Sequence, residues 1–197
     1  MSELNQLLLE LDYKCNFNEH DFFLSKSNSK AFKLIDRWPD WNKKILNISG
    51  EKFSGKSHLA NIFKIKSNAF LVKGKDIDNT IFKNFKLFES IIIDDFEECK
   101  EEQILYSIFN LIDQDSKYML INSLMPISEI KYNLPDLASR SKNCLYAEIE
   151  NPDDELLFAI ILKNFSDRQI KIEKKIINFI ISRIDRSYRK IDEFIYK

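Results

Sequence analysis

The segment Gly50–Ser57 limits the fold of this chain more than any other stretch of the sequence. It reads GEKFSGKS, which matches G-x4-G-K-[ST], the pattern of a loop that wraps around phosphate groups. The pattern needs a strand before it and a helix after it. Lys44–Ser49 (KILNIS) is expected to be that strand, and Ser57–Lys66 has the helical spacing of apolar residues. The sequence therefore predicts an α/β protein in which a strand delivers a phosphate-binding loop to the start of a helix.

The residue types in this loop suit phosphate binding. Glycines let the backbone curl so that successive N–H groups point at phosphate oxygens, and the helix N-terminus adds positive potential. Lys56 would neutralise the β and γ phosphates, and the Ser57 hydroxyl would ligate Mg²⁺. Two of the three glycines in the chain fall in this segment, which argues against a chance match and an ordinary strand–turn–helix corner. The expected nucleotide-binding residues are Gly50, Glu51, Lys52, Phe53, Ser54, Gly55, Lys56, Ser57 and His58.

One position of the loop departs from the usual pattern. Phe53 stands where such loops commonly carry a small residue, often glycine. The affinity for nucleotide is therefore expected to be lower than the motif alone suggests.

Two adjacent acids follow an apolar run further along the chain. Ile91, Ile92 and Ile93 precede Asp94 and Asp95, and such a run is typical of a strand buried on both faces of a parallel sheet. At this place Asp94, the first of the two acids, would hold Mg²⁺ together with Ser57 of the loop. The second acid would orient or activate an attacking water. Acids also end strands at ordinary turns, so the pair gains its meaning from its position after the phosphate-binding loop.

The remaining elements alternate between strand and helix patterns. Further strands are expected at Ala69–Val72, Ser90–Ile93 and Tyr118–Asn122, and a helix is expected at Gln103–Asp113. This alternation predicts a parallel sheet covered by helices on both sides.

After Asn151 the pattern changes to helices only. Pro152 and three acids mark the start of one helix, a second is expected at Glu173–Arg183, and a third begins near Arg186. We therefore expect an α/β unit over residues 13–150 and a small helical lid over residues 151–197.

The charge balance restricts the class of partner. The 30 basic residues are offset by 31 acidic ones, which argues against a protein whose main task is to grip nucleic acid through a basic face. Cys15, Cys99 and Cys144 show no metal-ligand spacing and are expected to be reduced thiols. With no leader pattern and no apolar run near 18 residues, a cytoplasmic protein without a membrane segment is expected.

Four segments together carry a resemblance to a known family. GEKFSGKSH followed by Leu59 and Ala60, then IIIDDF, MLINS and LPDLASR, resemble motifs of the AAA+ domain of the bacterial replication initiator DnaA. The closer likeness is to the Hda family of short regulators that inactivate DnaA. The resemblance runs from about Leu4 to Arg189. It implies an AAA+ fold with a helical lid, and it implies ATP or ADP with Mg²⁺ as the bound cofactors.

The resemblance also assigns roles to single polar residues. Asn122 matches a sensor residue that lies between the acids and the γ-phosphate, although an asparagine can also simply end a strand. Arg140 matches an arginine finger, which enters the site of a neighbouring molecule; a plain surface arginine is the alternative. Arg189 matches a second sensor in the lid, and Arg186, one turn earlier, competes for that role.

The start of the chain resembles a short peptide that binds the DNA polymerase sliding clamp. Residues 6–11 read QLLLEL, in which a glutamine would occupy a polar subsite while spaced leucines fill an apolar groove. The expected clamp-binding residues of this extended peptide (residues 1–12) are Gln6, Leu7, Leu9 and Leu11. A first strand or helix that packs into the domain itself is the alternative.

These observations favour one function and leave two others open. The chain ends at Lys197, so no room is expected for the helix-turn-helix domain of DnaA, which favours an adaptor over an initiator. The favoured function is a regulator that binds nucleotide, is tethered to the clamp, meets DNA only indirectly and promotes ATP hydrolysis on DnaA. The alternatives are a self-contained DNA-dependent ATPase and a nucleotide-locked scaffold. Hydrolysis by the chain itself and self-association into a homo-oligomer stay open.

Overall fold

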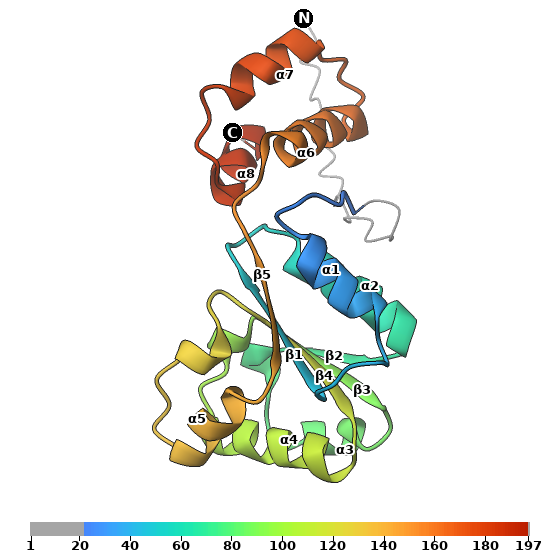
Figure 1. The fold of residues 1–197 in the computed structure, drawn as a ribbon, viewed down its shortest axis with the longest axis vertical. Coiled ribbons are helices and arrows are strands. Elements are labelled where there is room, and N and C mark those ends of the chain that lie inside the picture. Colours follow the sequence, from blue (N-terminus) through green and yellow to red (C-terminus); the bar gives the residue numbers. More distant parts are fainter. Residues whose placement is uncertain (1–21, 197) are drawn as a thin grey trace, which may run out of the picture.

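The structure is a computed structural model, and it describes residues 22–196 (Figure 1). The expected clamp-binding peptide, with Gln6, Leu7, Leu9 and Leu11, lies outside the described residues.

A five-stranded parallel sheet forms the centre of the α/β part. Its strands are β1 (Ile45–Gly50), β2 (Phe70–Lys73), β3 (Ser90–Asp94), β4 (Tyr118–Ser123) and β5 (Leu145–Ile149). They lie in the order β2-β3-β4-β1-β5, and every neighbouring pair is parallel. The predicted fold class is therefore confirmed, and each of the four strands expected from the sequence lies within one residue of its predicted bounds.

Helices cover both faces of the sheet because the buried strands are apolar on both sides. On β3, Ile92 packs into the core with α1 (Ser29–Asp36) and α2 (Lys56–Ser67). Its neighbours Ile91 and Ile93 point to the other face. That face carries α3 (Ile81–Phe85), α4 (Glu102–Gln114) and α5 (Pro135–Ser141), as Figure 1 shows.

Three helices follow the sheet and have a core of their own. They are α6 (Asp154–Asp167), α7 (Lys174–Ile181) and α8 (Tyr188–Tyr196). The start of α6 is fixed by its N-cap, because the Asp153 side chain accepts a hydrogen bond from the Leu156 N–H at 2.8 Å. The buried apolar residues at the centre of this group are Leu157, Ile161, Ile177, Ile191 and Ile195. Among residues 22–196, none of the helices is both long and apolar enough to cross a lipid bilayer.

Candidate nucleotide-binding site

The phosphate-binding loop joins the end of β1 to the start of α2, in the context that the motif requires. Gly55 is the N-cap of α2 and has a φ of +92°, a conformation that residues with a Cβ rarely adopt. At Gly50 the need for glycine is one of space, because a Cβ would lie 3.0 Å from the Ile149 carbonyl oxygen and from Ser54 Oγ. Both glycines of the motif are therefore required by the backbone path of the loop.

Lys56 is held inside this loop. It is buried, and its ammonium donates hydrogen bonds to the carbonyl oxygens of Gly50 at 2.7 Å and Glu51 at 2.8 Å. Burial lowers the pKa of Lys56, although the carboxylates of Glu97, Asp94, Asp95 and Glu51 act in the opposite direction. The Lys56 side chain thus lies at the centre of the loop, surrounded by acids and close to the N-terminus of α2.

The loop serine and the two polar residues of neighbouring strands form a hydrogen-bonded group. Ser57 Oγ donates to Asp94 Oδ2 at 2.8 Å, and Asn122 Nδ2 donates to Asp94 Oδ1 at 2.9 Å. Asp94 ends β3 and Asn122 lies near the end of β4, its neighbour in the sheet, so the parallel arrangement brings them together. The structure therefore brings the two expected metal ligands and the expected sensor residue into direct contact.

The donors of this group fit Mg²⁺. A hydroxyl and a carboxylate oxygen are hard ligands, and Mg²⁺ takes few of them from protein because it also uses phosphate oxygens and water. Within the described part of the chain, no group of three or more His, Cys, Asp or Glu side chains is placed to hold a metal ion. The Asn122 Oδ1 atom is buried beside Asp94 and has no hydrogen-bond partner among the described residues, as expected for an oxygen that awaits a further donor. The site therefore fits a magnesium ion that arrives with its nucleotide.

Asp95 lies next to this group in an unusual backbone conformation. It has a φ of +53° and leads into a short 3₁₀-helix at Phe96–Glu98. Partial burial and the nearby charges of Asp94 and Glu98 raise the pKa of its carboxyl group. A carboxylate with a raised pKa is a better proton acceptor, which suits the expected role in activating water.

Gly74 supports Asp95 and was not assigned any role from the sequence. A Cβ on Gly74 would collide with the carbonyl oxygen of Asp95 and lie 3.1 Å from the backbone N of Cys99. Only glycine therefore lets the turn after β2 approach the turn after β3. The signal was present in the sequence, since this is the third glycine of a chain that has only three.

Phe53 shows why small residues are usual at its position. Its φ is +67° and its side chain is 62% exposed, so the ring gains little from burial while the backbone is in the left-handed region. Lys52 beside it is exposed, and His58 in the first turn of α2 packs edge-on against Phe22 at 5.3 Å between ring centroids.

We expect Phe53→Gly to be more stable than Phe53→Ala by about 0.5–1 kcal/mol. The left-handed conformation costs a residue with a Cβ roughly 1–2 kcal/mol, and the greater freedom of glycine in the unfolded chain offsets part of this gain. Thermal unfolding measures the difference, which corresponds to a Tm about 1–4 °C higher for the glycine variant. An alanine variant as stable as the glycine variant would mean that residue 53 does not adopt this conformation in solution.

Arg140 lies near the start of β1, whereas the phosphate-binding loop follows the end of the same strand. It forms an ion pair with Asp113 near the end of α4 and lies over the Tyr106 ring at 5.5 Å. It also lines a small cavity of about 150 Å³ with Ile45, the first residue of β1. Because β1 rises by about 3.3 Å per residue, Ile45 and Gly50 at its two ends are about 16 Å apart. Arg140 is therefore not part of the hydrogen-bonded group around Lys56.

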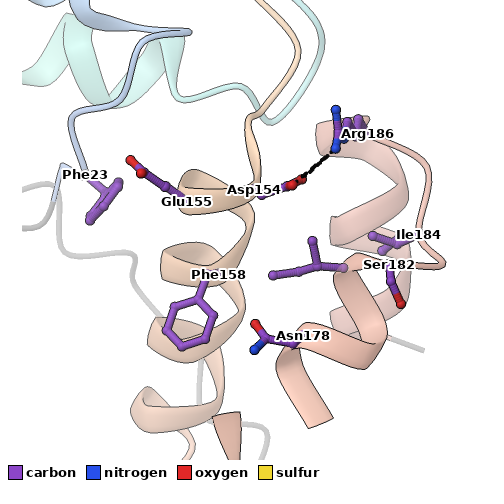
Figure 2. A pocket seen from close by; sticks show the side chains of 9 residues that line it. Phe23, Asp154, Glu155, Phe158, Asn178, Ser182, Ile184 and Arg186 are labelled. Atoms are coloured by element: carbon purple, nitrogen blue, oxygen red, sulfur yellow. Dashed lines mark hydrogen bonds and ion pairs between the residues drawn. The ribbon is translucent and has the colours of Figure 1, made fainter. Parts of the chain in front are cut away.

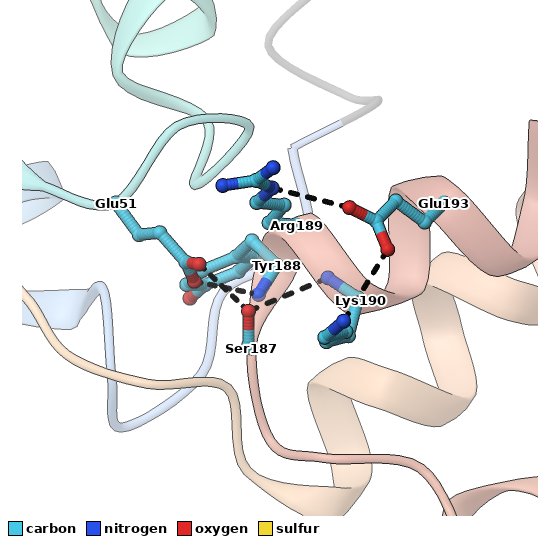
Figure 3. Close-up of polar contacts among 6 residues, drawn as sticks. All are labelled: Glu51, Ser187, Tyr188, Arg189, Lys190 and Glu193. Atoms are coloured by element: carbon cyan, nitrogen blue, oxygen red, sulfur yellow. Dashed lines mark hydrogen bonds and ion pairs between the residues drawn. The ribbon is translucent and has the colours of Figure 1, made fainter.

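The two lid arginines differ in their surroundings. Arg186 pairs with Asp154 at 3.0 Å. Arg189 Nε donates to Glu193 at 3.1 Å, and its side chain is 69% exposed in the first turn of α8. Figure 3 shows Arg189 on the side of α8 that faces Glu51 of the phosphate-binding loop. Arg189 directly follows Tyr188, whose backbone N–H donates a hydrogen bond to the Glu51 carboxylate at 2.9 Å.

A larger cavity of about 850 Å³ lies among the C-terminal helices (Figure 2). Its apolar lining includes Phe23 and Phe158, and Asp154 and Arg186 pair at its rim. It does not include the phosphate-binding loop, so the cavity and the group around Lys56 are separate features of the described residues.

Comparisons with known proteins agree with this fold. The chain is 26% identical over 161 residues to the chromosomal replication initiator protein DnaA of Borreliella afzelii, which covers 79% of this chain and 30% of that protein. The chain thus spans less than a third of the length of this curated relative. No family model matches the chain.

Solved structures of DnaA share the fold at low sequence identity. Domain III of DnaA from Thermotoga maritima superposes with a TM-score of 0.72 at 18% identity, over 92% of this chain and 86% of that one. AMPPCP-bound DnaA from Aquifex aeolicus gives a TM-score of 0.69 at 18% identity, over 89% of this chain and 62% of that one. Together with the sheet order and the C-terminal helices, these similarities identify the fold of this chain as that of a DnaA-like AAA+ domain.

Proposed function

We propose that this chain is a nucleotide-bound regulator that promotes ATP hydrolysis on the initiator DnaA. The proposal rests on the distance between the candidate nucleotide site, which lies at the carboxyl ends of the strands, and Arg140, which lies near their amino ends. The group around Lys56 and Asp94 is suited to bind a nucleotide, while Arg140 lies beside the start of β1, too far away to serve that nucleotide. An arginine in this place is suited to act on the nucleotide of another molecule.

In its own site, the chain would hold ATP or ADP through the phosphate-binding loop. The backbone N–H groups at the start of α2 and the Lys56 ammonium would bind the phosphate oxygens. Ser57 and Asp94 would hold Mg²⁺, which supplies positive charge against the β and γ phosphates when it is bound. Asn122 would keep Asp94 oriented, and Asp95 would orient a water molecule. The binding of AMPPCP by the similar Aquifex aeolicus protein supports ATP as a ligand.

Toward its partner, the chain would present Arg140. The guanidinium is half-buried between Asp113 and the Tyr106 ring, so its direction is set before any partner arrives. The loop before α5 is also fixed, because the Glu102 carboxylate accepts hydrogen bonds from Asn133 and from the Leu134 N–H at 2.8 Å. If the Arg140 guanidinium left Asp113 and bound phosphate oxygens instead, its planar group would donate two hydrogen bonds to the transferring phosphoryl group.

The tether to the sliding clamp is a separate part of the proposal. It depends on Gln6, Leu7, Leu9 and Leu11, which lie outside the described residues, and on the sequence likeness to the Hda family. The near balance of 30 basic and 31 acidic residues supports contact with DNA through such a partner.

A second candidate function is a self-contained DNA-dependent ATPase. The presence of both Asp94 and Asp95 at the end of β3 favours it, because an adaptor that only presents Arg140 would not need a pair of acids in its own site. In that case Arg140 would serve the phosphate-binding loop of a second copy of this chain.

The two functions are separated by measuring ATP hydrolysis by this protein alone, by DnaA alone, and by the two together with DNA-loaded clamp. We expect hydrolysis to rise only in the complete mixture. Triple replacement of Gln6, Leu7 and Leu9 by alanine should abolish this rise and leave nucleotide affinity unchanged. Hydrolysis by the protein alone that increases with DNA, without any effect on DnaA, would instead establish the self-contained ATPase.

A further inference from the structure

The side chain of Glu51 joins the phosphate-binding loop to the C-terminal helices (Figure 3). Its carboxylate accepts a hydrogen bond from Ser187 Oγ at 2.6 Å and another from the Tyr188 N–H at 2.9 Å. The backbone carbonyl of the same residue accepts the hydrogen bond from Lys56 at 2.8 Å. One residue thus contacts both the lysine of the loop and the start of α8.

The carboxylate is well matched to the start of α8. The first N–H groups of a helix have no partner within the helix, and the N-terminus carries a partial positive charge. Ser187 directly precedes α8 and accepts a hydrogen bond from the Lys190 N–H at 3.3 Å. Glu51 satisfies a further N–H of this turn and binds the capping serine. It therefore acts as an N-terminal cap supplied by another part of the chain.

A second contact fixes the same turn of α8. Tyr188 is buried, and its hydroxyl donates to the Glu150 carbonyl oxygen at 3.1 Å and lies 3.5 Å from Ser27 Oγ. The start of α8 is therefore attached to the end of the sheet and to the loop, while the following residue, Arg189, keeps an exposed side chain.

A carboxylate in this loop would otherwise oppose the function of the loop. Nucleotide phosphates are negative, and a carboxylate left in solvent beside them would repel them. Its engagement with α8 directs the charge away from the phosphates and toward a helix N-terminus.

We propose that Glu51 is a positioning residue that fixes the first turn of α8 on the phosphate-binding loop and so holds Arg189 at the mouth of the nucleotide site. The inference rests on the proposed nucleotide binding and adds to it the means by which the lid arginine is placed. The affinity for ATP would then depend on Glu51, although its carboxylate binds the start of α8 and not the phosphates.

The test is a double-mutant cycle in which Mg·ATP affinity is measured by calorimetry for Glu51→Ala, Arg189→Ala and the double variant. We expect each single variant to bind about tenfold more weakly, given the strength of charge-assisted hydrogen bonds. The double variant should bind no more weakly than Arg189→Ala, because Glu51 acts through Arg189. Glu51→Gln should fall between the wild type and Glu51→Ala, since an amide oxygen still accepts one of the two hydrogen bonds. Glu155→Ala, which removes an equal charge from α6, should bind as the wild type does.

Other outcomes of the same measurements would overturn the inference. If Glu51 acts only through its charge, Glu51→Ala will bind ATP as tightly as the wild type or more tightly. That result, or additive losses in the double variant, would overturn the inference and leave the proposed function standing. A wild-type protein that does not bind nucleotide would overturn both. Unfolding of Glu51→Ala would leave the decision to Glu51→Gln and Arg189→Ala, whose affinities would overturn the inference if they equalled that of the wild type.

Discussion

Replacing Arg140 with alanine should leave the protein folded and bound to nucleotide, yet unable to stimulate hydrolysis on DnaA. Arginine fingers contribute on the order of 10³–10⁵ in rate, so stimulation should disappear in a single-turnover assay with clamp and DNA. Folding should be little affected, because Arg140 pairs with Asp113 at the surface, where ion pairs contribute about 0–1 kcal/mol. Affinity for ADP should not change, because Arg140 lies at the other end of β1 from the phosphate-binding loop.

Two further variants sharpen this prediction. Arg140→Lys should restore little activity, because a point charge lacks the planar geometry that grips two phosphate oxygens. Lys142→Ala, which removes an exposed cation two residues away, should stimulate normally. Full stimulation by Arg140→Ala would end the finger assignment. Loss of only the chain's own hydrolysis would favour a homo-oligomeric ATPase.

Replacing Lys56 with alanine should weaken the affinity for both ADP and ATP by about 100-fold or more. The ammonium is the charge at the centre of the loop, and each charge-assisted hydrogen bond that it makes contributes about 1.5–3 kcal/mol. Fluorescence titration with a labelled nucleotide measures the change.

The control for this variant is Lys64→Ala, which removes an exposed lysine from the last turn of the same helix. It should keep the affinity of the wild type. If Lys56→Ala also did so, the phosphates would not bind at residues 50–57.

The parts of the site that the sequence predicted are those whose signal is local. The loop motif includes its own strand and helix, and the apolar run before Asp94 marks a buried strand whose end faces the same edge of the sheet. Because parallel strands share that edge, their order along the chain was enough to bring Asp94 and Asn122 together.

The missed features depend on contacts between distant parts of the chain. β5 was not predicted, because its sequence LYAEI places a half-buried tyrosine and an exposed glutamate in a short strand. The contact of Glu51 with Ser187 joins residues 136 positions apart, and no local pattern reports it. The pairing of Arg140 with Asp113 likewise requires α5 to pack on α4.

Calorimetric titration of the full chain with ATP and ADP tests most directly whether the carboxyl ends of these strands form a magnesium-nucleotide site. With Mg²⁺ present, we predict saturable binding of one nucleotide per chain. Removal of Mg²⁺ by a chelator should weaken the binding, because Ser57 and Asp94 would then face the phosphates without the ion between them. No saturable binding at millimolar nucleotide, or an affinity for ATP that does not depend on Mg²⁺, would show that the carboxyl ends of these strands are not a magnesium-nucleotide site.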